Sequence, residues 1–173
     1  MYGAIIGDIA GSRFEFHNIK TKDFELFHPG CSHTDDTVMT LAVARALLRS
    51  RARGTPFKKE AVSSMKELGR SYPCAGYGSR FKRWLSSARS KPCKSCGNGS
   101  AMRASPCGWA ASSRKEAVNL GYDSAAVTHN HPDGLDGGAV VSELVWLARN
   151  GASRQDVRKR AGAYMLDRQP GDR

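Results

Sequence analysis

Hydrophobic residues recur at intervals of three and four along most of the chain, which is the spacing of one face of an α-helix. After Thr34 these positions include Val38, Leu41, Ala42 and Leu48. The same spacing recurs in four later segments, which are 61–68, 81–88, 140–148 and 157–164. No alternating run bounded by turns predicts a strand or a β-hairpin. The pattern therefore predicts an all-α fold, a compact bundle of several helices.

Capping residues indicate where some of these helices begin and end. Thr34 is suited to cap a helix whose first turn carries two acids. Thr55 is suited to cap a second helix that starts at Pro56, and a third helix is expected to begin near Tyr77. Asn150 and the glycine after it predict the end of a fourth helix. Ser153, with Asp156 three residues later, resembles a capping box and predicts the start of a fifth.

The length and composition are those of an ordinary globular domain. A chain of 173 residues is long enough for one domain with a hydrophobic core, so residues 1–173 are expected to form a single domain. No segment has the roughly 20 apolar residues that a membrane helix needs. The apolar N-terminus has no basic residues and is interrupted by Asp8, which argues against a secretory signal. We therefore expect a cytoplasmic protein without a membrane partner.

Five cysteines and an uneven charge distribution complete this description. An odd number of cysteines without a signal favours reduced thiols, and the single pair Cys93-x-x-Cys96 does not predict a zinc site. From Arg45 to Lys94 the chain carries 14 Lys and Arg residues but only two acids, whereas the net charge of the whole chain is +11. Such an excess can attract nucleic acid, or it can be the solvated surface of helices. The solvated surface is favoured, because no stacking aromatics and no nucleic-acid motif accompany the basic residues.

The segment from Thr34 to Thr37 places two adjacent carboxylates between two hydroxyl groups. Oxygen ligands of this kind suit Mg²⁺, Mn²⁺ or Ca²⁺, and a cation would relieve the repulsion between Asp35 and Asp36. Taken alone, the same residues also fit a capped helix with solvated acids. A separate acid, Glu15, lies between two phenylalanines, where its pKa could be raised for proton transfer. Taken alone, however, the residues favour an exposed acid beside two buried rings.

Two polar loops are further candidates for a binding site. The first, Gly97–Arg103, is rich in glycine and could hold phosphate or diol oxygens with its backbone N–H groups, although it also fits a simple turn. The second, Thr128–Gly134, contains two histidines, an asparagine and an aspartate before a helix. Loops with such side chains often line sites, but this one also fits a polar turn, and its His-x-His spacing matches no structural zinc module.

These segments, in this order, resemble the ADP-ribosylglycohydrolase family. Gly3–Gly11 with Ser12 and Glu15 is similar to the opening helix of the family, and Thr34–Ala42 is similar to its first metal motif. The two polar loops resemble its substrate loop and its ribose-side loop, and Tyr72–Gly78 resembles a further family segment. Each motif is weak alone, but four in the same order are specific, and the likeness extends from residue 3 to about residue 165.

The resemblance implies an all-α hydrolase that cleaves the glycosidic bond between ADP-ribose and a protein side chain or a small acceptor. It implies a binuclear Mg²⁺ or Mn²⁺ centre, with Thr34, Asp35 and Asp36 as ligands. Glu15 and Asp36 would be the catalytic carboxylates, and ADP-ribosylated proteins or small ADP-ribosyl compounds the substrates. The residues expected to bind the substrate are Asn98, Gly99, Ser100, Met102, His129 and His131.

One part of the family pattern has no counterpart in this sequence. A second metal motif, of the Gly-Gly-Asp-Ser-Asp-Thr type, is expected near the C-terminus of a typical member, and the sequence matches about the first three-fifths of such a member. Two alternatives to an active hydrolase therefore stand. The chain could be a truncated, weakly active or inactive fragment that binds ADP-ribose, or a basic module that binds nucleic acid.

Overall fold

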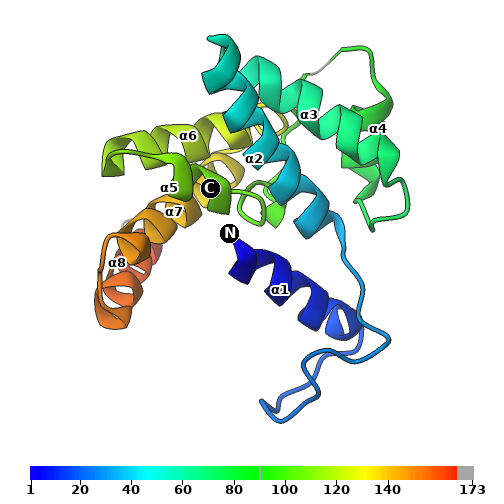
Figure 1. Ribbon diagram of the computed structural model, residues 1–173, viewed down its shortest axis with the longest axis vertical. Helices are drawn as coiled ribbons and strands as arrows, with labels where there is room; N and C mark the ends of the chain where they lie inside the picture. The colour runs from blue at the N-terminus through cyan, green and yellow to red at the C-terminus, as the bar shows by residue number, and fades with distance from the viewer. Residues whose placement is uncertain (90, 167–173) are drawn as a thin grey trace. The chain divides into compact units, whose positions relative to one another are not determined.

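The computed structural model describes residues 1–89 and 91–166, and Figure 1 shows the order of their helices. Within these residues the regular structure is helical, and an isolated parallel bridge pairs Cys93 with His129. The prediction of an all-α fold is thus confirmed. None of the described helices is both long and apolar enough to cross a membrane. The described chain divides into two compact units, Met1–Lys91 and Pro92–Arg173, and the single domain over 1–173 stays a prediction.

The first unit is built around a pair of long helices. Its elements are α1 (Tyr2–Gly11), the short 3₁₀ helix η1 (Ser12–Phe14), α2 (Asp35–Arg53), α3 (Phe57–Ser71) and α4 (Ser79–Ser86). Helix α2 packs mainly against α3, and the two run side by side in Figure 1. Met39, Val43 and Met65 are fully buried in this unit. This packing fixes the axis of α2, and therefore the direction in which its acidic first turn projects.

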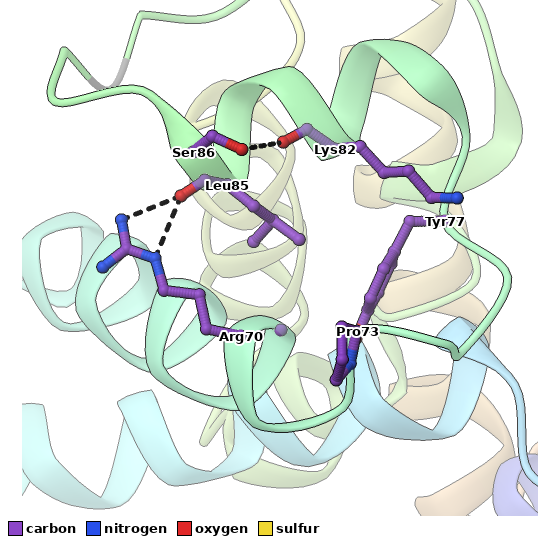
Figure 2. Close-up of a pocket in the computed structure, with 7 residues that line it drawn as sticks. Arg70, Pro73, Tyr77, Lys82, Leu85 and Ser86 are labelled. Atoms are coloured by element: carbon purple, nitrogen blue, oxygen red, sulfur yellow. Dashed lines mark hydrogen bonds between the residues drawn. The ribbon is translucent and has the colours of Figure 1, made fainter.

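Several side chains of the basic stretch are used within this unit. Arg45 Nη2 and Arg49 Nη1 lie 3.0 and 3.1 Å from Glu67 Oε2, so two cations of α2 share one carboxylate of α3. Arg70 donates two hydrogen bonds to the carbonyl oxygen of Leu85, which ties α3 to α4 (Figure 2). The two helix interfaces thus give these arginines a structural role.

The second unit is organised around one central helix. Its elements are η2 (Asn98–Ser100), α5 (Ser105–Ala110), α6 (Arg114–Ala126), α7 (Pro132–Arg149) and α8 (Arg154–Leu166). Helix α7 packs against α5, α6 and α8. Glycines allow the closest approaches. A Cβ atom on Gly121 would lie 2.4 Å from the carbonyl oxygen of Gly138, and one on Gly108 would lie 2.4 Å from that of Ser142.

Replacing Gly121 by alanine is expected to lower the free energy of unfolding by about 2–3 kcal/mol, because the new methyl group would push α6 away from α7. The matched control is Gly162→Ala in α8, where an added Cβ meets no atom within 4 Å. That change should be neutral or stabilise the chain by up to about 1 kcal/mol through helix propensity. Urea unfolding of both variants measures the difference, and equal effects of the two substitutions would contradict this packing.

Three of the predicted helix ends are confirmed. Thr34 caps α2, with its hydroxyl accepting a hydrogen bond from the backbone N–H of Asp36 at 3.3 Å. Asn150 caps the C-terminus of α7. The hydroxyl of Ser153 accepts from the Asp156 N–H at 3.1 Å, and the Asp156 carboxylate accepts from the Ser153 N–H at 3.1 Å, so the predicted capping box begins α8.

Two predicted helix starts were wrong by one or two residues. Pro56 is the N-cap of α3 and not its first residue, because its ψ of 130° is extended. Thr55 therefore does not cap the helix, and its hydroxyl donates to Glu60 Oε1 at 2.9 Å. The helix expected near Tyr77 begins at Ser79, because Gly78 has an extended ψ of 151°.

Candidate functional site

Asp8, on α1, holds the start of α2 in place. Its Oδ2 accepts from the backbone N–H groups of Thr34 and Thr37 at 2.8 and 3.1 Å. Its carboxylate also accepts from the hydroxyl groups of both threonines, at 2.6 and 2.5 Å. Three of these four donors bind Oδ2 and one binds Oδ1, so the carboxylate is tied to both threonines through backbone and side-chain groups. We infer that Asp8 orients the acidic turn of α2.

The hydroxyl of Thr34 takes part both in the hydrogen bonds to Asp8 and in the helix cap. It donates to Asp8 Oδ1 and accepts from the Asp36 N–H, which leaves one lone pair for a further partner. As the cap residue, Thr34 fixes Asp35 and Asp36 as the first two residues of α2, where the helix dipole favours negative charge. The start of α2 thereby places the oxygen-bearing side chains of Thr34, Asp35 and Asp36 together.

Four carboxylates influence one another electrostatically in this part of the first unit. Burial, together with the neighbouring charges of Asp36, Glu15 and Asp8, raises the pKa of Asp35 from 3.8 to about 6, against a backbone hydrogen bond that lowers it. Burial also raises the pKa of Asp36, again with contributions from Asp8 and Glu15. Burial and the repulsion between these anions therefore favour the protonated forms of Asp35 and Asp36. A bound cation would relieve the repulsion.

In the absence of divalent cations, Asp35 should make the folded chain less stable as the pH rises from about 4 to about 7. A folded-state pKa near 6, above the ordinary 3.8, means that the folded state binds more protons than the unfolded state in this window. The stabilisation is present below pH 4 and is lost as the pH passes through 6. Urea unfolding in EDTA should show the free-energy difference between the parent chain and Asp35→Asn falling over this range. A difference that is constant with pH would contradict the raised pKa.

Glu15 follows η1 and is exposed. Of the flanking rings, Phe14 is half-buried and makes an edge-to-face contact with Phe24, at 5.1 Å between ring centroids. Phe16 is 85% exposed. Glu15 is therefore the exposed acid that its flanking residues alone favoured, but the expectation of buried rings on both sides is wrong, because Phe16 is exposed. The charge of Glu15 nevertheless acts on Asp35 and Asp36, so it belongs with them and Asp8 to one acidic cluster.

The segment 75–78 lies next to Asp35. Gly76 has a φ of +94°, which favours glycine, and a Cβ atom there would lie 3.7 Å from Asp35 Oδ1. The adjacent Tyr77 is buried, and its hydroxyl has no hydrogen-bond partner within the described residues. Burial, with a contribution from the charge of Asp35, raises the pKa of Tyr77 to about 12, so its hydroxyl remains protonated beside the cluster.

The donor chemistry of this cluster suits a hard divalent cation. Among residues 1–89 and 91–166, no three His, Cys, Asp or Glu side chains lie close enough together to hold a metal ion by themselves. Mg²⁺, however, is commonly bound by one or two carboxylates and retains several water molecules. The hydroxyl of Thr34 and the carboxylates of Asp35 and Asp36 match that requirement.

In the second unit, the two polar loops pack against each other. Cys93 N–H donates to the carbonyl of Thr128 at 3.0 Å, which aligns the segment before the first loop with the second. The buried hydroxyl of Ser100 donates to the carbonyl of Gly134 at 2.5 Å. A Cβ atom on Gly134 would lie 2.7 Å from His129 Cδ2, so glycine is required for this contact.

The predicted substrate-binding residues therefore share one region of the second unit but differ in exposure. Asn98 is exposed, Met102 is half-buried, and a Cβ atom on Gly99 would lie 3.8 Å from the ring of His129. His129 itself is only 7% exposed. His131 is the N-cap of α7, where its Nδ1 accepts from the backbone N–H of Asp133 at 3.2 Å.

A separate cavity of about 310 Å³ lies between α3 and α4 (Figure 2). In Figure 2 the side chain of Leu85 points between the helices, while the Arg70 guanidinium is turned toward the carbonyl of Leu85. None of the predicted site residues lines this cavity. Its lining residues are Gly69, Arg70, Pro73, Tyr77, Lys82, Leu85 and Ser86.

Comparison with known proteins agrees with the arrangement of motifs. Residues 1–171 match the family model of the ADP-ribosylglycohydrolases. The chain is also 28% identical, over 187 aligned positions, to the ADP-ribosylhydrolase ARH3 of Mus musculus. That alignment covers 89% of this chain and 49% of the mouse protein, so the chain spans about half the length of the curated relative it matches. With a family match over nearly its whole length, the chain belongs to the ADP-ribosylglycohydrolase family.

Proposed function

We propose that the chain supplies the first metal-binding segment and the ADP-ribose loop of a divalent-cation-dependent hydrolase that releases ADP-ribose from a modified side chain or small acceptor. The observation that carries the proposal is the acidic turn of α2. Two adjacent half-buried carboxylates with raised pKa values are held in place there by the four hydrogen bonds of Asp8. Family membership gives this turn its chemical context.

In this proposal the first unit would supply the cation ligands and the proton-transfer group. Thr34, Asp35 and Asp36 would hold the cation, either Mg²⁺ or Mn²⁺. When bound, the cation would orient the ribose diol and polarise water. Glu15, which is exposed and electrostatically coupled to the cluster, would transfer a proton during hydrolysis.

The reaction breaks the bond between the anomeric carbon and the acceptor atom, adds the oxygen of water to that carbon, and delivers a proton to the acceptor. Its transition state has oxocarbenium-ion character, as in other glycoside cleavage.

In the second unit, the loop containing Asn98, Gly99, Ser100 and Met102 would bind ADP-ribose. The ring of His129 lies against this loop at Gly99, and His131 is the N-cap of α7.

The test is release of free ADP-ribose from an ADP-ribosylated protein by the 173-residue chain, with Mg²⁺ or Mn²⁺ and with EDTA. Release that requires the cation supports the proposal. Equal release in EDTA would contradict the metal role. ADP-ribose binding without release under any of these conditions would favour the alternative of an inactive ADP-ribose-binding fragment, which the mouse relative's greater length makes a specific competitor.

A further inference from the structure

The guanidinium of Arg103 is a buried positive charge in the second unit. Arg103 is 1% exposed, and its Nε has no hydrogen-bond partner within the described residues. Its Nη2 donates to the carbonyl of Ser124 at 2.9 Å and to the hydroxyl of Thr128 at 2.6 Å. Burial lowers its pKa to about 10, so the guanidinium still carries its charge at neutral pH. Burying a charge is costly, which points to a specific role for the contacts of Arg103.

The hydroxyl of Thr128 connects Arg103 to His129 through hydrogen bonds. It lies 2.7 Å from His129 Nδ1 and 3.4 Å from the carbonyl oxygen of Ala125. Arginine can only donate, so Thr128 Oγ1 accepts from Arg103 and has one hydrogen of its own to give. The carbonyl of Ala125 already accepts from the backbone N–H groups of Thr128 and His129. We infer that the hydroxyl hydrogen is given to the shorter contact, which makes Nδ1 of His129 the acceptor.

This assignment fixes the protonation of the imidazole ring. With Nδ1 accepting, the ring proton lies on Nε2. The ring also forms a hydrogen bond with the backbone of Gly97, in which Nε2–H must be the donor. Burial, together with the charge of Arg103, lowers the pKa of His129 to about 4, so the ring is neutral at physiological pH.

The ring of His129 is in turn packed between the two polar loops. It contacts Gly134 so closely that a Cβ there would lie 2.7 Å from Cδ2, and Gly99 approaches its Cε1. Ser100 connects the loop to the same Gly134 through its hydroxyl. A change in the orientation of the ring would therefore shift the backbone of residues 97–100.

We propose that Arg103 and Thr128 are positioning residues, which hold His129 as the neutral Nε2–H tautomer and thereby fix the 97–100 loop in its ADP-ribose-binding conformation. Neither side chain is exposed enough to touch a ligand directly, since Arg103 is 1% and Thr128 3% exposed. The inference rests on the proposed function for the identity of the ligand. The hydrogen-bond chain itself is independent of that function.

The experiment uses the complete 173-residue chain labelled with ¹⁵N. Long-range proton–nitrogen spectra, with His129→Gln to assign the signals, report which ring nitrogen of His129 carries the proton. Calorimetry measures the Kd for ADP-ribose. Thr128→Val removes the hydroxyl at nearly constant volume, and Thr128→Ser restores it. Ser142→Ala is the matched control, because it removes a buried hydroxyl of the same unit that donates to Ala117 at 2.7 Å.

We expect the parent chain and Thr128→Ser to show the Nε2–H tautomer with Nδ1 as a hydrogen-bond acceptor. In Thr128→Val the ¹⁵N signal of Nδ1 should shift, because this nitrogen loses its donor, and ADP-ribose should bind about tenfold more weakly. Ser142→Ala should keep both the tautomer and the affinity. A proton on Nδ1 in the parent chain, or parental affinity in Thr128→Val, would overturn the positioning role. Absence of ADP-ribose binding by the parent chain would instead overturn the proposed function, while the tautomer would still decide the hydrogen-bond chain.

Discussion

Asp36→Asn is expected to reduce cation-dependent release of ADP-ribose by about 100-fold or more. The carboxylate would lose its charge at the position where the acidic turn is proposed to hold the cation. Loss of a Lewis acid removes several kcal/mol of transition-state stabilisation. Asp35→Asn should have a similar effect, because both residues occupy the first turn of α2. Rates of release at saturating Mg²⁺ or Mn²⁺ provide the measurement.

The matched control for these variants is Asp23→Asn, which neutralises an exposed acid of the first unit outside the cluster. Its release rate should equal that of the parent chain. Urea unfolding distinguishes loss of chemistry from loss of folding. Relief of repulsion should leave Asp35→Asn and Asp36→Asn at least as stable as the parent chain at neutral pH without metal. Full release by both variants would remove the acidic turn from the mechanism.

Removing both arginines that surround Glu143 is expected to destabilise the chain by about 3–5 kcal/mol, because it would leave a buried carboxylate without a partner. Glu143, on α7, is 1% exposed. Its Oε1 lies 2.5 Å from Arg114 Nε of α6, and Arg160 of α8 donates to both carboxylate oxygens at 3.1 and 3.2 Å. The double variant Arg114→Met with Arg160→Met tests this by urea unfolding.

The converse substitution sharpens the test. In Glu143→Met the two arginines remain, and their side chains are 51% and 31% exposed, so water can solvate them. Replacing a buried ion by an apolar side chain of similar volume is often nearly neutral. The single variant should therefore be less destabilised than the double arginine variant. The opposite order would show that Glu143 is not the group that requires compensation.

Local signals predicted much of the helical structure. Thr34 and the Ser153–Asp156 pair were recognisable because a capping side chain acts on a backbone only two or three residues away. The start of α6 carries the same type of signal. Ser113 accepts from the Glu116 N–H at 3.1 Å, and this Ser-x-x-Glu pattern could have predicted the helix. Helix α5 is only six residues long and has no such cap, so it offered little to recognise.

The candidate site was predictable in its residue types but not in its supporting contacts. Adjacent acids after a threonine indicated an acidic helix start, whereas the role of Asp8 depends on contacts across 26 and 29 residues of sequence. The same holds for Arg103, whose bonds reach residues 21 and 25 positions away. Exposure is also set by tertiary packing, which explains why Phe16, beside Glu15, was expected to be buried and is 85% exposed.

The central claim is that the acidic turn of α2 binds a divalent cation, and titration of the chain with Mn²⁺ followed by electron paramagnetic resonance tests it most directly. The signal of free Mn²⁺ should decrease on addition of the parent chain at pH 8, where Asp35 is ionised, and decrease much less at pH 5. Asp36→Asn should leave the signal of free Mn²⁺ unchanged, while Asp23→Asn should behave as the parent chain. Equal Mn²⁺ binding by the parent chain and Asp36→Asn, or no binding by the parent chain at pH 8, would contradict the account.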